Sequence, residues 1–193
     1  MSMSLSKADG AADLPGVTGL HIGLSWDTST GGAGAFLGKI REMKGTNLDL
    51  LAYAMQGEKP VSYAGLDNQD PEPGIHHTGD NKTGKADGDD ELVQIDFAKV
   101  PPEITGVLFA VAAFQRGTSF GKAKNVKIRV YDATGGSPTE VAVVRPSLLG
   151  NANFIGVAKA FRSGSGWQFE VVDKTGNITQ GKPESLIRAA VGM

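Results

Sequence analysis

The sequence predicts an all-β fold, an antiparallel β-sandwich of two sheets with Greek-key links and one or two short helices. Short segments with alternating apolar and polar residues recur along the chain, and runs rich in glycine, proline, asparagine or aspartate separate them. Glycine is abundant, with 27 of 193 residues, as in a chain that turns often. About eight short strands at this spacing are typical of a sandwich.

The expected strands extend from the first part of the chain nearly to its end. Residues 19–26 place Leu20, Ile22, Leu24 and Trp26 on one face, as in a half-buried strand. Residues 48–55 form an apolar run rich enough to be buried on both faces. The remaining strands are expected over residues 92–97, 106–114, 125–132, 140–145, 154–161 and 167–172.

Two other segments favour helices. One covers residues 33–45, and the other covers residues 183–191, where Pro183 suits a first helical turn. Residues 1–12 show neither pattern, and we expect them to be frayed. The length is that of one domain, so residues 1–193 are expected to form a single unit.

Composition excludes several classes of function. The net charge is -2, which gives no general attraction to nucleic acid or to an anionic membrane. The chain has no cysteine, which excludes disulfides, thiolate metal sites and cysteine nucleophiles and favours a reducing compartment. No run approaches the ~18 apolar residues of a membrane span, and the first residues lack the apolar core of a secretion signal. We therefore expect a cytoplasmic protein that neither binds nucleic acid nor inserts into a membrane.

The acidic loop, residues 77–91 (HTGDNKTGKADGDDE), is the most unusual segment. It carries five carboxylates, and four of them fall within residues 87–91. Two carboxylates about 5 Å apart repel each other by roughly 1 kcal/mol even in water. These carboxylates nevertheless lie close together in a glycine-rich segment, and their repulsion needs a chemical explanation.

Two familiar loop types do not fit this segment. Gly79 to Lys85 matches the spacing of a phosphate-binding loop, but Ala86 follows where Ser or Thr would bind magnesium. As a twelve-residue EF-hand loop, residues 80–91 place Lys82 at a ligand position and Lys85 where glycine is required. Neither a nucleotide site nor an EF-hand is expected.

The chemistry of the acidic loop still favours calcium. Ca²⁺ takes six to eight oxygen ligands at about 2.3–2.6 Å in flexible geometry. Gly79, Gly84 and Gly88 let the backbone fold back so that carbonyl and carboxylate oxygens can point inward. A bound divalent cation would turn the repulsion into attraction. The alternative is a solvated acidic loop with no ligand, which charge runs often form.

Other oxygen donors lie at strand ends. Asp27 closes the first expected strand, and Asn47 and Asp49 stand two residues apart, so that their side chains share one face of a strand. An aspartate against an apolar sheet is costly unless it is paired or bound to a metal. The alternative is that Asn47 and Asp49 cap the wet end of their strand.

The order of these motifs resembles the TerD family of tellurium-resistance and stress proteins. The loop GDNKTGKADGDDE, followed by LVQIDFAKVP, is similar to the family's loop, strand and turn. Three further stretches agree in order: HIGLSWD, RGTSFGKAKNVKIRVYD and FIGVAKAFRSGSGWQFEVV. The chain differs from the family pattern in four places. Asn47 replaces an acid, Ala86 replaces a glycine, the gap between Asp27 and Asn47 is longer, and Gln115 lies near the position of an expected acid. The resemblance covers about residues 4–173.

The resemblance implies a calcium-binding β-sandwich without known catalytic machinery, acting by ion-dependent binding in a bacterial stress-response or tellurite-resistance system. It implies Ca²⁺ as the bound ion. The expected partner is an unidentified protein of a membrane-associated stress complex. The candidate ligands are Asp27, Asn47, Asp49, Asp80, Asn81, Thr83, Asp87, Asp89, Asp90 and Glu91.

A metal-dependent hydrolase that uses the same acidic loop is the alternative function. It would need an open metal position and a general base near the ion. His76 and His77 adjoin the loop, but neighbouring residues of a strand point to opposite faces and cannot readily bind one ion together. His21 lies on the polar face of the first strand. We therefore expect a binding protein and not an enzyme.

Overall fold

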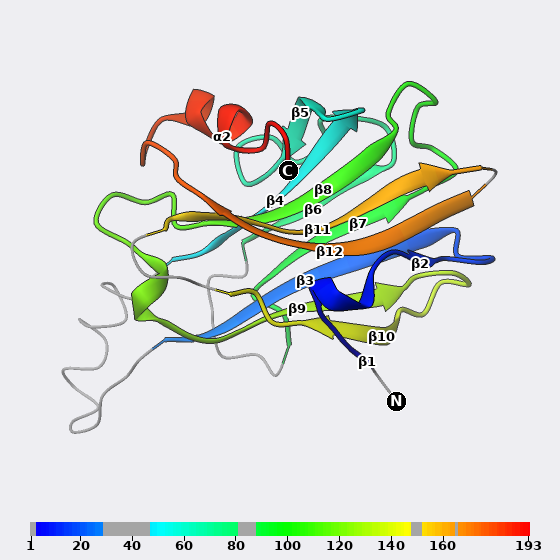
Figure 1. Cartoon of the computed structure of the whole chain (residues 1–193), viewed down its shortest axis with the longest axis horizontal. Helices are drawn as coiled ribbons and strands as arrows, with labels where there is room; N and C mark the ends of the chain where they lie inside the picture. Colours follow the sequence, from blue (N-terminus) through cyan, green and yellow to red (C-terminus); the bar gives the residue numbers. More distant parts are fainter. Residues whose placement is uncertain (1–2, 29–46, 81–87, 148–151, 165) are drawn as a thin grey trace.

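A computed structural model describes residues 3–28, 47–80, 88–147, 152–164 and 166–193. The chain forms two six-stranded sheets that pack face to face (Figure 1). Sheet A contains, in this order, β1 (Met3–Leu5), β10 (Thr139–Val144), β9 (Ala123–Asp132), β3 (Gly19–Thr28), β7 (Glu91–Asp96) and β6 (Ile75–Asp80). Sheet B contains β2 (Ala12–Asp13), β12 (Gly166–Gly176), β11 (Phe154–Ser163), β8 (Gly106–Ala112), β4 (Asp49–Gln56) and β5 (Lys59–Ala64).

The strand order confirms the predicted sandwich. Successive segments of the chain alternate between the layers: β4 and β5 lie in sheet B, β6 and β7 in sheet A, β8 in sheet B, β9 and β10 in sheet A, and β11 and β12 in sheet B. All pairings are antiparallel except that of β1 with β10. Two 3₁₀ turns, η1 (Lys7–Asp9) and η2 (Phe120–Lys122), and one helix, α2 (Pro183–Ala189), complete the described elements. None of the described helices has the length and apolar character needed to cross a bilayer.

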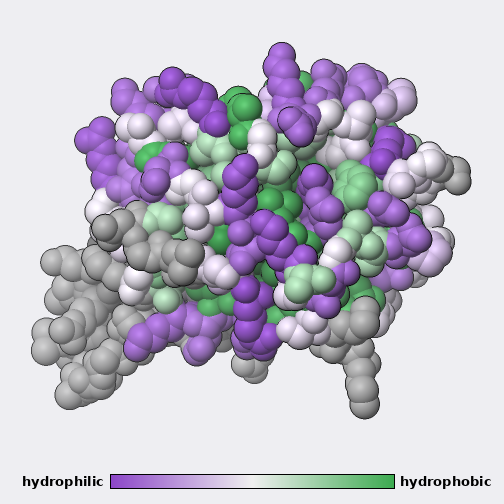
Figure 2. Space-filling model, in the orientation of Figure 1, coloured by the Kyte–Doolittle hydropathy of each residue, from purple (hydrophilic) through white to green (hydrophobic). Residues whose placement is uncertain are grey.

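The main core fills the space between the sheets. Leu20, Ile22 and Leu24 of β3 are fully buried and belong to the same cluster as Phe109 of β8 and Phe169 of β12. This is the face that the alternating pattern of residues 19–26 predicts. In Figure 2, apolar surface gathers toward the middle of the molecule, between polar side chains above and below it.

A second core covers the outer face of sheet B. Helix α2 packs there, with Leu186 against Tyr53 and Phe154, and Tyr53 donates a hydrogen bond to the Leu186 carbonyl at 3.2 Å. Strands β4 and β8 are therefore buried on both faces, as the apolar runs of their sequences predict. The predicted C-terminal helix is confirmed, but it ends at Ala189.

The N-terminal segment differs from the expectation of a frayed end. Met3–Leu5 pairs with β10, and Ala12–Asp13 pairs with β12. Both strands are too short to show a hydrophobic period, and backbone hydrogen bonds to a sheet edge hold them in place. The helix predicted over residues 33–45 lies outside the described residues.

Candidate metal centre

Four strand ends meet at one end of the sandwich. Strands β3 and β7 are antiparallel with Leu24 opposite Glu91, so the end of β3 and the start of β7 lie together. The end of β6 joins them, because Asp80 pairs with Glu91. Strand β4 of sheet B begins with Asp49 at the same end, because Glu91 accepts a hydrogen bond from the second residue of β4, Leu50. The acidic loop leaves β6 and enters β7 here.

Glu91 links the two sheets across the core. Its side chain is 1% exposed, and Oε2 accepts a hydrogen bond of 2.6 Å from the backbone N–H of Leu50 in β4. The carboxylate therefore lies in the interior, next to the residue that follows Asp49. A buried carboxylate is costly unless donors or cations surround it. This contact brings the last acid of the loop to the start of β4 in sheet B.

Asp49 and Asn47 form the sheet B side of this site. The Asn47 side chain donates a hydrogen bond to Asp49 Oδ1 at 3.3 Å, so the two side chains share one side of the strand, as predicted. Asp49 Oδ2 accepts a hydrogen bond from the backbone N–H of Phe114 at 3.3 Å, which fixes the carboxylate at the end of β8. Asp49 directly precedes Leu50, so its backbone lies next to the N–H group that Glu91 reaches.

Asp90 binds a different strand from Glu91. Its backbone N–H donates to the Leu24 carbonyl at 2.7 Å, and Oδ2 accepts from the Trp26 N–H at 3.1 Å. The Trp26 contact falls where a bulge between Ser25 and Asp27 interrupts the pairing of β3 with β9. The expectation that Asp90 and Glu91 point in different directions is confirmed, because their side chains bind β3 and β4 respectively.

Asp89 lies on the outer face of sheet A. Its Oδ2 accepts a hydrogen bond from the Tyr131 hydroxyl at 2.6 Å, and its Oδ1 lies 3.5 Å from Nε of Arg129. Burial raises the pKa of the Asp89 carboxyl, and the hydrogen bond from Tyr131 and the charge of Arg129 oppose that shift. Asp89 is thus held against β9, whereas the Glu91 carboxylate contacts β4.

Five of the predicted ligands are not described at the level of their side chains. The backbones of Asp27 and Asp80 belong to β3 and β6 and end those strands on the same side of the sandwich as Glu91. Asn81, Thr83 and Asp87 lie outside the described residues. Their assignment as ligands stays a prediction.

His77, which the sequence indicated only as a candidate for the alternative hydrolase, lies beside Glu91 in the structure. The ring is fully buried, Nε2 lies 3.4 Å from Glu91 Oε2, and Nδ1 accepts a hydrogen bond from the Gly79 N–H at 3.0 Å. The alternation of β6, which turns His77 inward, was the available signal.

The described oxygen donors are of the kind that a hard cation prefers, but they are fewer than the six to eight that Ca²⁺ takes. Asn47, Asp49 and Glu91 offer carboxylate and amide oxygens, which suit calcium better than zinc. Among residues whose side chains the structure describes, no three His, Cys, Asp or Glu are grouped closely enough to hold a metal ion. A complete oxygen shell would need donors from residues 80–87.

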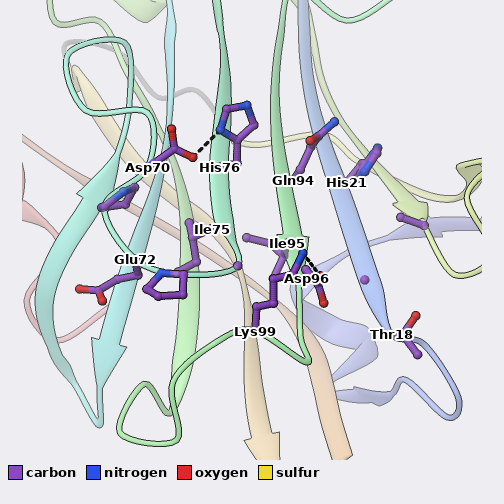
Figure 3. A pocket seen from close by; sticks show the side chains of 15 residues that line it. Thr18, His21, Asp70, Glu72, Ile75, His76, Gln94, Ile95, Asp96 and Lys99 are labelled. Atoms are coloured by element: carbon purple, nitrogen blue, oxygen red, sulfur yellow. Dashed lines mark hydrogen bonds and ion pairs between the residues drawn. The ribbon is translucent and has the colours of Figure 1, made fainter.

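A separate depression of about 760 Å³ lies on the outer face of sheet A, at the end away from the acidic loop (Figure 3). His21, Gln94 and His76 stand opposite one another on β3, β7 and β6 and line it. His76 Nδ1 lies 2.7 Å from Asp70 Oδ1, and burial lowers the pKa of His21. Two of the three histidines considered for hydrolysis thus face this depression, whereas the His77 ring is buried.

Comparison with known proteins agrees with this architecture. The model of the TerD domain family matches residues 1–181. The chain belongs to the TerD family. The match covers both sheets and the acidic loop between β6 and β7, so the family resemblance seen in the motifs is confirmed.

Characterised relatives in the TerD family carry names of two kinds. Stress response protein SCP2 of Bacillus subtilis (strain 168) is 33% identical, covering 93% of this chain and 96% of that protein. Tellurium resistance protein TerD of Serratia marcescens is 30% identical, covering 89% of this chain and 90% of the relative. The names describe resistance and stress response.

A solved TerD-family structure has the same fold. The crystal structure of a homologue of telluride resistance protein (TerD) from Streptomyces coelicolor A3(2) superposes with a TM-score of 0.64. It is 20% identical and covers 89% of this chain and 96% of the other. At this identity, the likeness supports the sandwich fold alone.

Proposed function

We propose that this TerD-family protein is a calcium-binding module that acts in a stress response or in tellurium resistance by ion-dependent binding, without catalysis. The proposal is supported mainly by the 2.6 Å hydrogen bond from Leu50 N–H to Glu91, which brings the last acid of the loop to the strand that begins with Asp49. This contact joins the start of β7 in sheet A to the start of β4 in sheet B at the end of the sandwich where the acidic loop enters β7.

The bound ion would neutralise the carboxylates of the loop and strand ends. Glu91 and Asp49 would hold it from the two sheets, with Asn47 as a neutral donor and residues 80–87 supplying the remaining oxygens. Such an ion would order the acidic loop, because the loop's like charges repel one another without it. The ordered loop would present a shaped surface to a protein partner in the cytoplasm, within a membrane-associated stress complex.

The geometry favours binding over hydrolysis. A metal-dependent hydrolase would need a base with access to substrate near the ion. His77 lies beside Glu91, but its ring is fully buried and Nδ1 is occupied by the Gly79 N–H. His21 and His76 line the separate depression of Figure 3.

Calorimetric titration with Ca²⁺ after dialysis against a chelator tests the proposal. We expect Glu91→Gln and Asp49→Asn each to weaken binding at least about tenfold, because each removes a negative charge beside the ion. Glutamine at position 91 can still accept the Leu50 hydrogen bond, which limits structural damage. Asp70→Asn removes a mostly exposed carboxylate on the other depression and should bind like wild type. Wild-type protein that takes up no Ca²⁺ would refute the proposal.

A further inference from the structure

Asp89 is held by groups that have no part in the proposed ion site. Its side chain is 11% exposed and lies against the outer face of sheet A. Tyr131 of β9 donates to one carboxylate oxygen at 2.6 Å, and Arg129 of the same strand lies 3.5 Å from the other. Arg129 also donates to Ser25 Oγ at 3.4 Å, which ties the guanidinium to β3. Both carboxylate oxygens are therefore directed at β9.

Gly23 provides the space that Asp89 occupies. It sits opposite Arg129 in β3, between Ile22 and Leu24, which are buried on the inner face. A Cβ at residue 23 would point outward and overlap the Asp89 carboxylate. The Gly23 backbone is not in the left-handed region, so an alanine there would be resisted by its overlap with Asp89 and not by backbone strain. The glycine at position 23 therefore leaves room for the Asp89 carboxylate.

Three consecutive residues at the end of the acidic loop bind three different strands. Asp89 contacts β9 on the outer face, Asp90 contacts the backbone of β3, and Glu91 crosses the core to β4. Because the residues are adjacent, fixing Asp89 also limits where Asp90 and Glu91 can lie. Ordering a segment before it binds removes part of the entropy cost of binding.

We infer that Asp89 is an anchor and not an ion ligand: with Tyr131, Arg129 and Gly23 it forms a latch that fixes the end of the acidic loop on sheet A and so positions Asp90 and Glu91. The inference rests on the proposed calcium binding for its functional consequence, and it reassigns one of the ligands predicted from sequence. Tyr131, Arg129 and Gly23 become positioning residues of the ion site.

Two substitutions test the latch without altering any carboxylate. Tyr131→Phe removes the hydroxyl, and Gly23→Ala displaces the Asp89 side chain. Each should weaken Ca²⁺ binding about tenfold, the scale of one lost hydrogen bond to a charged group. Tyr63→Phe is the matched control, because the Tyr63 hydroxyl donates to Asp67 at 2.8 Å in a pair of the same chemistry on β5. The control should bind calcium like wild type.

A double-mutant cycle separates an anchor from a ligand. If Asp89 acts through Tyr131, the Asp89→Asn, Tyr131→Phe double variant should bind calcium no more weakly than Asp89→Asn alone. If Asp89 binds the ion directly, Asp89→Asn should lose affinity while Tyr131→Phe and Gly23→Ala bind like wild type. That second pattern would overturn the inference and leave the proposed function intact.

The latch can also be measured without calcium. In chelator, the Asp90 amide donates to the Leu24 carbonyl at 2.7 Å, so its hydrogen exchange, followed by NMR, reports whether the loop end stays in place. Tyr131→Phe and Gly23→Ala should speed this exchange at least about threefold, and Tyr63→Phe should not. Unchanged exchange in both latch variants would refute the inference. Faster exchange in a protein that binds no calcium would support the latch and refute the proposed function.

Discussion

Single residues at the acidic end show how much of the site local sequence can predict. The alternation of a strand predicts that Asp90 and Glu91 diverge and that Asn47 and Asp49 share a side, and the structure has both arrangements. Nothing local predicts that Glu91 bonds Leu50, because this contact joins residues 41 positions apart and depends on how the sheets pack. The Asp89 contacts with β9 are equally long-range.

Asp96 gives a prediction about pH at the residue scale. The ion pair with Lys99, with Nζ at 2.9 Å from Oδ2, holds the pKa of the Asp96 carboxyl below its usual value. A lowered pKa means that the folded state favours the ionised form, so this stabilisation is present above about pH 4 and is lost as the pH falls through the folded pKa.

We expect Asp96→Asn to lower the melting temperature by about 1–3 °C at pH 7, because exposed ion pairs contribute little. At an acid pH below the lowered pKa of Asp96 in the folded state, the variant and wild type should melt together, since the carboxylate is then protonated. Circular dichroism melts at both pH values measure this. An equal deficit at the two pH values would show that the carboxylate's charge is not the cause.

At the scale of elements, strands with a clear hydrophobic period could be predicted and others could not. In β3, β7, β8 and β9, the residues that the sequence pattern predicts to face the core are buried. Strand β5 contains Pro60, and β6 has the polar sequence IHHTGD, so neither shows the pattern of a half-buried strand. These strands form because the sheet edges supply backbone partners, which a single segment of sequence does not reveal.

Helix α2 should contribute stability without affecting the ion site. Leu186 is 4% exposed and packs in the second core, on the outer face of sheet B. Leu186→Ala should destabilise the fold by about 2–4 kcal/mol, the usual cost of removing a buried leucine side chain. Urea unfolding measures this, and the affinity for Ca²⁺ should stay within about twofold of wild type. A comparable loss of calcium affinity would show that the two regions are coupled.

For the molecule as a whole, calcium binding and folding should be linked. An ion that binds only the folded state stabilises it by about 2.7 kcal/mol at a hundredfold excess over Kd. For a chain of this length, 1 kcal/mol corresponds to roughly 2–4 °C in melting temperature. Saturating Ca²⁺ should therefore raise the melting temperature by about 5–10 °C over protein in chelator.

The most direct measurement is the melting temperature of wild type and Glu91→Gln, each in millimolar Ca²⁺ and in chelator. We expect a rise of about 5–10 °C for wild type and a much smaller rise for the variant, because the variant lacks the charge that Glu91 brings to the start of β4. A wild-type protein that melts at the same temperature in both solutions would contradict the calcium site on which the account rests.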